Sequence, residues 1–321
     1  MSTLDFSTTI GNAWFPAPTF TASGCASSGR ELAQFFPLRD MGGVVTKSVM
    51  SKVRPGRPTP RMAETPSGML NSIGLQGPGI DAFLAKDVPY LVEQKARVIV
   101  SIAGETVEEY STLARKLRAV SGISAIEVNI SCPNLEADGM AFAVSAEATF
   151  KVISEIRAAT AHPIWAKLSP NAASIASIAK AAEDAGADAI VMGNTILGMA
   201  IDARTRKPKL GNVMGGLSGP AIKPIALRLV HQCYRQVRIP IIGCGGISNA
   251  EDAVEFMLAG ASAVQVGTAS FIDPGIMGKI IDGLQAYCLE MGVDRISELT
   301  GQLDADPLLP ARWLRFAEQS L

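Results

Sequence analysis

A closed (β/α)8 barrel is the fold class that the sequence predicts. Eight short apolar runs recur along the 321 residues, and several are apolar at consecutive positions, as in strands buried on both faces of a parallel sheet. Amphipathic stretches between the runs complete the β-α units of such a barrel. No G-x-G-x-x-G follows the first strand, which disfavours the alternative, an open doubly wound sheet.

The eight predicted strands share this apolar character. The first two read PAPTFTA and GGVVTKS, the next four RVIVSIA, AIEVNIS, PIWAKLS and DAIVMGN, and the last two IPIIGCG and SAVQVGT. They cover residues 16–22, 42–48, 97–103, 125–131, 163–169, 188–194, 239–245 and 262–268.

Helices are predicted between the strands. Residues 105–120, 171–187 and 220–237 carry apolar residues at three- and four-residue spacing, with charges elsewhere. Residues 249–261 begin with an asparagine suited to N-capping and end at a glycine. A peripheral C-terminal helix is expected over residues 300–321.

Long inserts are expected after strands 2, 4 and 6. Residues 49–80 follow the second strand and residues 195–218 follow the sixth. The carboxyl ends of barrel strands are where active sites are built, so these inserts should surround the site. Without an internal repeat or a low-complexity linker, the chain is expected to be a single domain over residues 1–321.

Composition and charge exclude several classes of function. Basic residues number 29 and acidic residues 30, so a net charge of -1 gives no electrostatic reason to expect nucleic acid or an anionic membrane as partner. No apolar run reaches the ~18 residues that span a bilayer. The N-terminus lacks a basic region followed by an apolar block, so no signal peptide is expected and the protein is predicted to be cytoplasmic.

The cysteines and histidines exclude further kinds of site. The odd number of cysteines and the lack of a C-x-x-C pair argue against a disulfide framework, a structural zinc site and an iron–sulfur cluster on this chain alone. Neither His162 nor His231 stands in a triad-like pattern, so a histidine base is not expected. The five cysteines are Cys25, Cys132, Cys233, Cys244 and Cys288.

Polar residues recur at the carboxyl ends of the predicted strands. Capping and turn formation explain any single asparagine or serine equally well. Lys47 and Lys167 point more strongly to a site, because a lysine ending an apolar strand costs desolvation unless it faces a partner charge. The polar residues are Lys47, Ser48, Ser101, Asn129 to Asn134, Lys167, Asn194 and Thr195.

Glycines follow the last two predicted strands, in GCGG (243–246) and VGT (266–268). Loops of this kind expose backbone N–H groups and bind phosphates in many barrels. A pair of tight βα turns is the alternative explanation.

Cys132 is expected just beyond the fourth strand, over the barrel mouth. Its possible roles are nucleophile, metal ligand and proton acceptor, but further metal ligands and a neighbouring histidine base are lacking. Proton abstraction by a thiolate remains, provided that the pKa of the thiol falls toward neutrality. The neighbouring asparagines would suit an amide-rich substrate.

In combination these residues resemble the class 1 dihydroorotate dehydrogenases, and more closely the B type, from about residue 14 to residue 285. The segments AETPSGMLNSIGLQ and TRKP favour the B type over the A type. The motifs are TKS (46–48), AETPSGMLNSIGLQGPG (63–79), EVNISCPN (127–134), AKLSPN (166–171), GNT (193–195), IDARTRKP (201–208), GGLSGPAIKP (215–224), PIIGCGGI (240–247) and VGTASF (266–271).

The resemblance implies FMN at the barrel mouth, one per chain, and dihydroorotate stacked on it. Cys132 would be the general base, and Lys47 would also take part in catalysis. The flavin contacts implied are Ser23, Lys47, Ser48, Ser101, Asn129, Lys167, Gly193, Gly219, Gly245, Gly246, Gly267 and Thr268. The substrate contacts implied are Lys47, Asn71, Ser72, Ile73, Gly74, Leu75, Asn129, Asn134, Asn194 and Thr195.

The resemblance also implies a reaction and an assembly. Cys132 would take a proton from C5 of dihydroorotate while hydride leaves C6 for FMN, giving orotate for pyrimidine synthesis. Electrons would pass to NAD through a partner subunit that holds FAD and a [2Fe-2S] cluster, in a homodimer joined by two partner subunits. Fumarate, as in A-type relatives, is the alternative acceptor.

The chain departs from B-type relatives at three places. Ser101 and Arg57 each stand where relatives usually carry asparagine, and the loop 135–147 lacks their glycine-rich pattern. The rival hypotheses are a dihydropyrimidine or dihydrouridine reductase, a non-redox phosphate-binding barrel, and a non-catalytic flavin-binding subunit.

Overall fold

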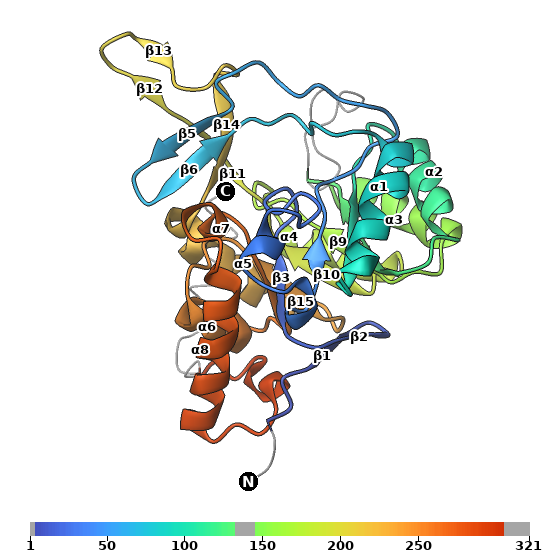
Figure 1. Cartoon of the computed structure of the whole chain (residues 1–321), viewed down its shortest axis with the longest axis vertical. Helices are drawn as coiled ribbons and strands as arrows, with labels where there is room; N and C mark the ends of the chain where they lie inside the picture. Colours follow the sequence, from blue (N-terminus) through green and yellow to red (C-terminus); the bar gives the residue numbers. More distant parts are fainter. Residues whose placement is uncertain (1–3, 132–144, 305–321) are drawn as a thin grey trace.

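A computed structural model describes residues 4–131 and 145–304, and its centre is an eight-stranded parallel sheet. The order in the sheet is β3-β16-β15-β10-β9-β8-β7-β4 (Figure 1). Every one of these strands falls within or overlaps one of the eight predicted runs. The strands are β3 (Thr19–Thr21), β4 (Val44–Val45), β7 (Val98–Ile102), β8 (Ile123–Asn129), β9 (Ile164–Lys167), β10 (Ala189–Met192), β15 (Ile241–Cys244) and β16 (Ala263–Val266).

The two edge strands of this sheet meet, which gives a barrel in place of an open sheet. A parallel bridge pairs Phe20 with Gly43, and the Gly42 N–H donates to the Thr19 carbonyl at 2.8 Å. The Thr21 hydroxyl also accepts from the Val45 N–H at 2.9 Å. The predicted α/β fold is therefore confirmed as a nearly closed, eight-stranded parallel barrel, joined at this seam by an isolated bridge.

Helices cover the outside of the barrel, and side-chain caps fix where several of them begin. Thr106, Ser145 and Asn249 each accept a hydrogen bond from a backbone N–H in the first turn of α2, α3 and α6. The α-helices are α1 (Ile80–Glu93), α2 (Val107–Leu117), α3 (Ala146–Ala159), α4 (Ile175–Asp184), α5 (Lys223–Tyr234), α6 (Ala250–Leu258), α7 (Ala269–Ile272) and α8 (Ile276–Met291). Short 3-10 turns are η1 (Leu32–Gln34), η2 (Leu38–Asp40), η4 (Pro220–Ile222) and η5 (Ile296–Leu299).

Four of these helices correspond to the predicted ones, with shorter extents. The segment 220–237 begins as the 3-10 turn η4, and the segment 171–187 is helical only from Ile175. The predicted C-terminal helix over 300–321 lies for the most part outside the described residues. None of the helices within the described ranges combines the length and apolar character needed to cross a bilayer.

The barrel interior is apolar at the amino-terminal end of the strands. Trp165, Phe20 and Phe15 pack edge to face there, with ring centroids 5.0–5.6 Å apart. Phe15 comes from a hairpin of β1 (Thr8–Ile10) and β2 (Ala13–Phe15), which the sequence did not predict. The aromatic packing closes this end, so polar chemistry is left to the other end of the barrel.

A second, antiparallel sheet stands beyond the carboxyl ends of the barrel strands, with order β11-β14-β6-β5. It combines the segment after β4 with the segment after β10, and in Figure 1 it projects together with the β12–β13 ribbon. Its strands are β5 (Met62–Thr65), β6 (Gly68–Asn71), β11 (Ile196–Met199) and β14 (Met214–Ser218), and the ribbon consists of β12 (Ile201–Asp202) and β13 (Lys207–Pro208). The insert expected after the fourth strand falls mainly on residues outside the described ranges.

Candidate functional site

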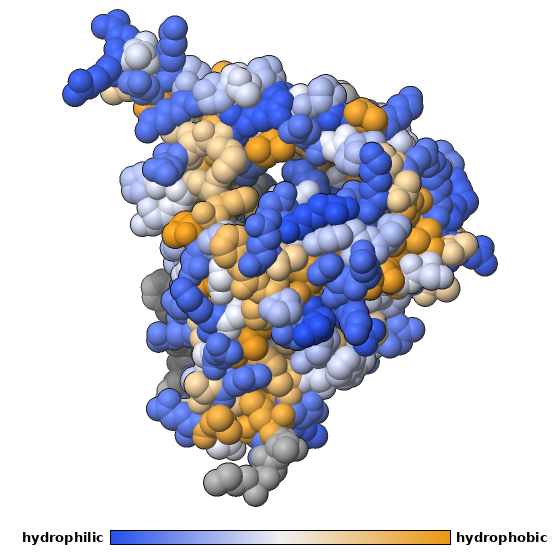
Figure 2. All heavy atoms as spheres, viewed as in Figure 1, coloured by the Kyte–Doolittle hydropathy of each residue, from blue (hydrophilic) through white to orange (hydrophobic). Residues whose placement is uncertain are grey.

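A cavity of about 2430 Å³ lies between the carboxyl ends of the barrel strands and the antiparallel sheet. Figure 2 shows the molecule hollowed beneath the projecting sheet. Single small-ligand pockets usually measure about 300–1,000 Å³. This cavity is therefore large enough for a cofactor and a substrate together.

A layer of polar side chains lies between the apolar core and the cavity, and among its members Lys167 lines the cavity itself. Ser101, Glu127, Lys167 and Gln265 each lie two residues after an apolar residue of the barrel interior, for example Trp165 before Lys167. Because side chains alternate along a strand, residues two apart point to the same face. The strand pattern therefore stacks this polar layer directly on the apolar core.

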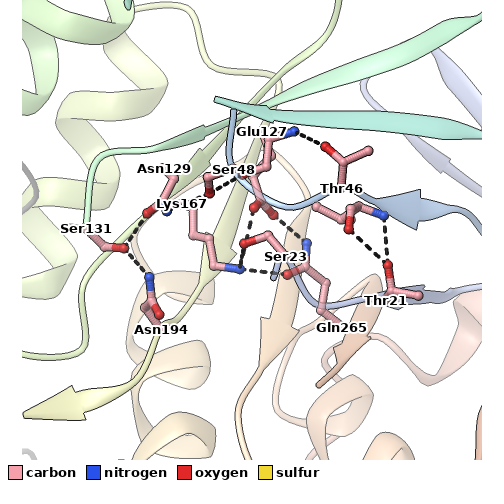
Figure 3. Close-up of polar contacts among 12 residues, drawn as sticks. Thr21, Ser23, Thr46, Ser48, Glu127, Asn129, Ser131, Lys167, Asn194 and Gln265 are labelled. Carbon is pink, nitrogen blue, oxygen red and sulfur yellow. Dashed lines mark hydrogen bonds and ion pairs between the residues drawn. The ribbon is translucent and has the colours of Figure 1, made fainter. Parts of the chain in front are cut away.

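Lys167 is almost fully buried in this layer, with 3% of its side chain exposed. Its Nζ donates to Gln265 Oε1 at 3.0 Å and to Ser23 Oγ at 3.5 Å, and it lies 3.5 Å from Glu127 Oε1. Gln265 Nε2 donates in turn to Glu127 Oε2 at 2.7 Å. Figure 3 shows the side chains of Lys167, Glu127 and Gln265 converging from β9, β8 and β16. The ammonium is thus held in one place at the edge of the cavity.

Charge keeps Lys167 protonated despite its burial. Burial lowers the pKa of the ammonium, but the Glu127 carboxylate and the other neighbours outweigh burial, so that the pKa of Lys167 is raised above its ordinary value. The thiols of Cys25 and Cys244 lie close by. Burial raises the pKa of Cys25 to about 11 and also raises the pKa of Cys244, so both thiols stay neutral near pH 7.

A chain of hydrogen bonds crosses the barrel mouth from β7 toward β10. Ser101 Oγ and Ser48 Oγ are 2.9 Å apart, and Asn129 Nδ2 donates to Ser48 Oγ at 2.9 Å. Ser131 Oγ donates to Asn129 Oδ1 at 2.7 Å, and Asn194 Nδ2 donates to Ser131 (Figure 3). Asn129 and Asn194 are thereby oriented at the cavity wall.

The glycine loops bring backbone unusually close to the cavity. Gly219 and Gly246 have φ of +93° and +80°, which a side chain rarely tolerates. A Cβ on Gly246 would meet the Lys223 backbone nitrogen at 2.8 Å and the Gly219 carbonyl oxygen at 2.9 Å. Thr268 Oγ1 donates to Ser218 Oγ at 2.8 Å on the same wall. The loops form a cradle of backbone and hydroxyl groups that fits a phosphate.

The opposite wall comes from β6 and the loop after β10. Asn71 Nδ2 donates to the Gly216 carbonyl at 3.4 Å, which ties β6 to β14. Asn194 Oδ1 accepts from the Thr195 N–H at 2.8 Å. The amide groups of Asn71 and Asn194, from two separate segments of the chain, therefore line the same cavity, as an amide-rich ligand would require.

Most of the predicted site residues line this one cavity. Ser101 is fully buried and stands behind Ser48, so it does not reach the cavity surface. Cys132 and Asn134 lie outside the described residues. Lining the cavity are Ser23, Lys47, Ser48, Asn71, Ser72, Ile73, Gly74, Leu75, Asn129, Lys167, Gly193, Asn194, Thr195, Gly219, Gly245, Gly246, Gly267 and Thr268.

Sequence reasoning missed Glu127 and Gln265, and it gave Ser131 no role beyond its place among the polar residues at strand ends. Glu127 and Gln265 stand inside the apolar runs AIEVNIS and SAVQVGT, where a lone polar residue costs desolvation unless it has a partner. That was a usable signal, since two such residues in one barrel can pair. Ser131 gave no comparable signal, because a serine at a strand end is ordinary. No cluster of metal ligands occurs within residues 4–131 and 145–304.

Comparison with known proteins gives consistent matches. The family model described as dihydroorotate dehydrogenase matches residues 5–288. The catalytic subunit of dihydroorotate dehydrogenase B (NAD(+)) from Desulforamulus reducens is 51% identical over 298 residues, which cover 93% of this chain and 98% of that protein. The subunit of the same name from Pelobacter propionicus is 50% identical over 89% of this chain and 94% of its own. That from Geobacter sulfurreducens is 47% identical over 94% of this chain and 98% of its own.

Proposed function

The chain belongs to the dihydroorotate dehydrogenase family, and from this premise we propose that it is the FMN-dependent catalytic subunit of a B-type enzyme. It would oxidise (S)-dihydroorotate to orotate in pyrimidine biosynthesis. The observation that carries the proposal is the 51% identity to a catalytic subunit of that name over 93% of the chain. The cavity supports it with a phosphate cradle, a buried cation and converging amides.

The residues of the cavity fit FMN. The backbone of Gly245, Gly246 and Gly267 would hold its phosphate, since these glycines line the cavity and their loops pack too tightly against Ile222, Lys223 and Cys25 to admit side chains. Lys167 would place its ammonium at the pyrimidine edge of the flavin, where a cation stabilises negative charge. Ser23, Lys47, Ser48, Asn129 and Gly193 would line the rest.

The chain's own residues would bind and orient the substrate. Asn71, Asn129, Asn134 and Asn194 offer paired amide donors and acceptors to the ring amides, and the Lys47 ammonium suits the carboxylate. Cys132 would remove the proton from C5. Bound FMN would supply the acceptor for the hydride that leaves C6. The polar chain from Ser101 to Asn194 keeps the asparagines preorganised.

The electron acceptor and the assembly are part of this proposal. The relatives at about 50% identity are named as NAD(+)-linked catalytic subunits. We therefore place an electron-transfer subunit with FAD and a [2Fe-2S] cluster beside a homodimer of this chain. Omitting that subunit should abolish NAD reduction and leave dye reduction intact.

Substrate choice distinguishes this function from dihydropyrimidine or dihydrouridine reduction. We expect dihydroorotate to be oxidised with a dye acceptor, and 5,6-dihydrouracil to react about 10² to 10⁴ times less efficiently, because the site would hold a carboxylate that dihydrouracil lacks. Steady-state kcat/KM values measure this ratio. A preference for dihydrouracil would replace the proposed substrate by a neutral pyrimidine.

The phosphate cradle gives a further prediction. Gly246→Ala should prevent FMN from binding, because the new Cβ would stand 2.8 Å from the Lys223 nitrogen at a φ of +80°. Gly275→Ala is the matched control, since Gly275 has a φ of -85° and lies at the start of α8. FMN content after purification and the affinity of the apoprotein for FMN measure the effect. Full retention of FMN by Gly246→Ala would place the phosphate elsewhere.

A further inference from the structure

Glu127 is a carboxylate buried completely inside the barrel. None of its surface is exposed, and it stands in β8 between the apolar neighbours Ile126 and Val128. Its Oε2 accepts from Gln265 Nε2 at 2.7 Å. Its Oε1 forms an ion pair with Lys167 Nζ at 3.5 Å. The side chain thus has two described partners, and one of them is the cation at the cavity.

Stability alone does not account for this pair. Desolvating two charges costs several kcal/mol per ion, and replacing a buried ion pair by well-packed apolar residues is often neutral or stabilising. Interior residues of the neighbouring layer, such as Ile99 and Trp165, show that this barrel can be filled with apolar side chains. The buried pair of Glu127 and Lys167 is therefore better explained by a role at the adjacent cavity than by a contribution to stability.

Glu127 is the carboxylate that acts on Lys167 among the described residues. The groups that face Lys167 are Glu127 from β8, Cys244 from β15 and Cys25 from the loop after β3. Burial raises the pKa of both thiols, so neither supplies negative charge near pH 7. The remaining charged neighbour of Cys25, Lys47, is itself a cation. The protonation of Lys167 thus depends on Glu127.

We propose that Glu127 is a positioning residue: it keeps Lys167 cationic and aimed at the cavity, with Gln265 as the clamp that joins the two. This inference rests on the proposed function, because the ligand of the cation is FMN. Gln265 contributes by accepting from Lys167 and donating to Glu127 at once, which fixes both side chains. Lys167 without its counter-charge would be a buried lone ammonium, which readily loses its proton.

The test is the affinity of the apoprotein for FMN as a function of pH, followed by flavin fluorescence quenching. In the unmodified chain the affinity should change less than about threefold between about pH 7 and about pH 9.5, because Lys167 stays charged. In Glu127→Gln it should fall at least about tenfold over the same range, as a charge-assisted hydrogen bond becomes a neutral one. The two-electron reduction potential of bound FMN should show the same added pH dependence.

Three further variants separate this role from a structural one. Gln265→Leu keeps both charges but removes the clamp, so it should give a weaker effect in the same direction. The double variant Glu127→Gln, Lys167→Gln removes both charges. It should bind FMN weakly at every pH, and its FMN affinity should not change with pH over this range. Asp188→Asn breaks the ion pair with Arg157 at the amino-terminal end of the barrel and should leave the pH profile flat.

The outcomes are distinguishable. A flat FMN affinity profile in Glu127→Gln, matching the unmodified chain, would overturn the inference and leave the proposed function standing. Failure of the unmodified chain to bind FMN would overturn the proposed function itself. If Glu127→Gln does not fold, Gln265→Leu decides: an unchanged pH profile there contradicts the positioning role.

Discussion

Replacing Cys132 by alanine should lower the rate of dihydroorotate oxidation by about 10² to 10⁴-fold while FMN stays bound, because general-base catalysis contributes a factor of that size. The proposed FMN contacts come from the barrel strands and the glycine loops, and Cys132 is not among them. Stopped-flow mixing with dihydroorotate, followed by flavin absorbance, measures the reduction step directly. The FMN content of the purified variant is measured in parallel.

The control for this change is another cysteine. Cys233→Ala removes a thiol that is fully buried in α5, and it should leave the reduction rate unchanged. Cys132→Ser should recover part of its rate only at high pH, since a hydroxyl is a far weaker acid than a thiol. Equal rates for Cys132→Ala and the unmodified chain would remove Cys132 from the chemistry.

Lys167→Met should have the second large effect. It removes the cation that we propose to lie at the flavin edge, and losing one such stabilising donor costs about 10² to 10³ in rate. It also leaves Glu127 as an unpaired buried carboxylate, a loss of about 3–5 kcal/mol in stability for a broken buried pair. Reduction rates and denaturant unfolding of the same preparation measure the two effects separately.

Two companion variants apportion these effects. Lys167→Met with Glu127→Leu should recover stability, because no unpaired charge remains, but it should not recover the rate. Arg157→Met removes the ion pair with Asp188, which is about one-third exposed, and should leave FMN reduction unchanged. Recovery of the rate in the double variant would mean that the cation itself is dispensable.

The barrel strands were predictable because a strand buried on both faces reads as an uninterrupted apolar run. RVIVSIA became β7 and DAIVMGN became β10, although the structure trims each by a residue or more at its ends. The hairpin of β1 and β2 was missed because each strand has only three residues with no marked alternation. Its packing against Trp165 is a tertiary contact that no local pattern reports.

The antiparallel sheet shows a different limit. β6 pairs with β14 through Asn71 and Gly216, from two segments that are separated along the chain by four of the eight barrel strands. The local sequence marks such segments only as loops. Their pairing depends on the barrel, which brings the carboxyl ends of β4 and β10 to the same face of the molecule. The same holds for the polar layer at the cavity: Lys167 was predicted as a strand-end cation, whereas its pairing with Glu127 required the barrel to close.

The most direct test of the central claim is an anaerobic titration of the purified, FMN-loaded chain with dihydroorotate, followed by flavin absorbance. The flavin is expected to bleach as about one equivalent of dihydroorotate is added, because the proposed site carries the acceptor and the base in one cavity. Dihydrouracil should cause no bleaching at the same concentration. A protein that binds FMN but stays yellow with excess dihydroorotate would contradict the assignment of dihydroorotate as the substrate.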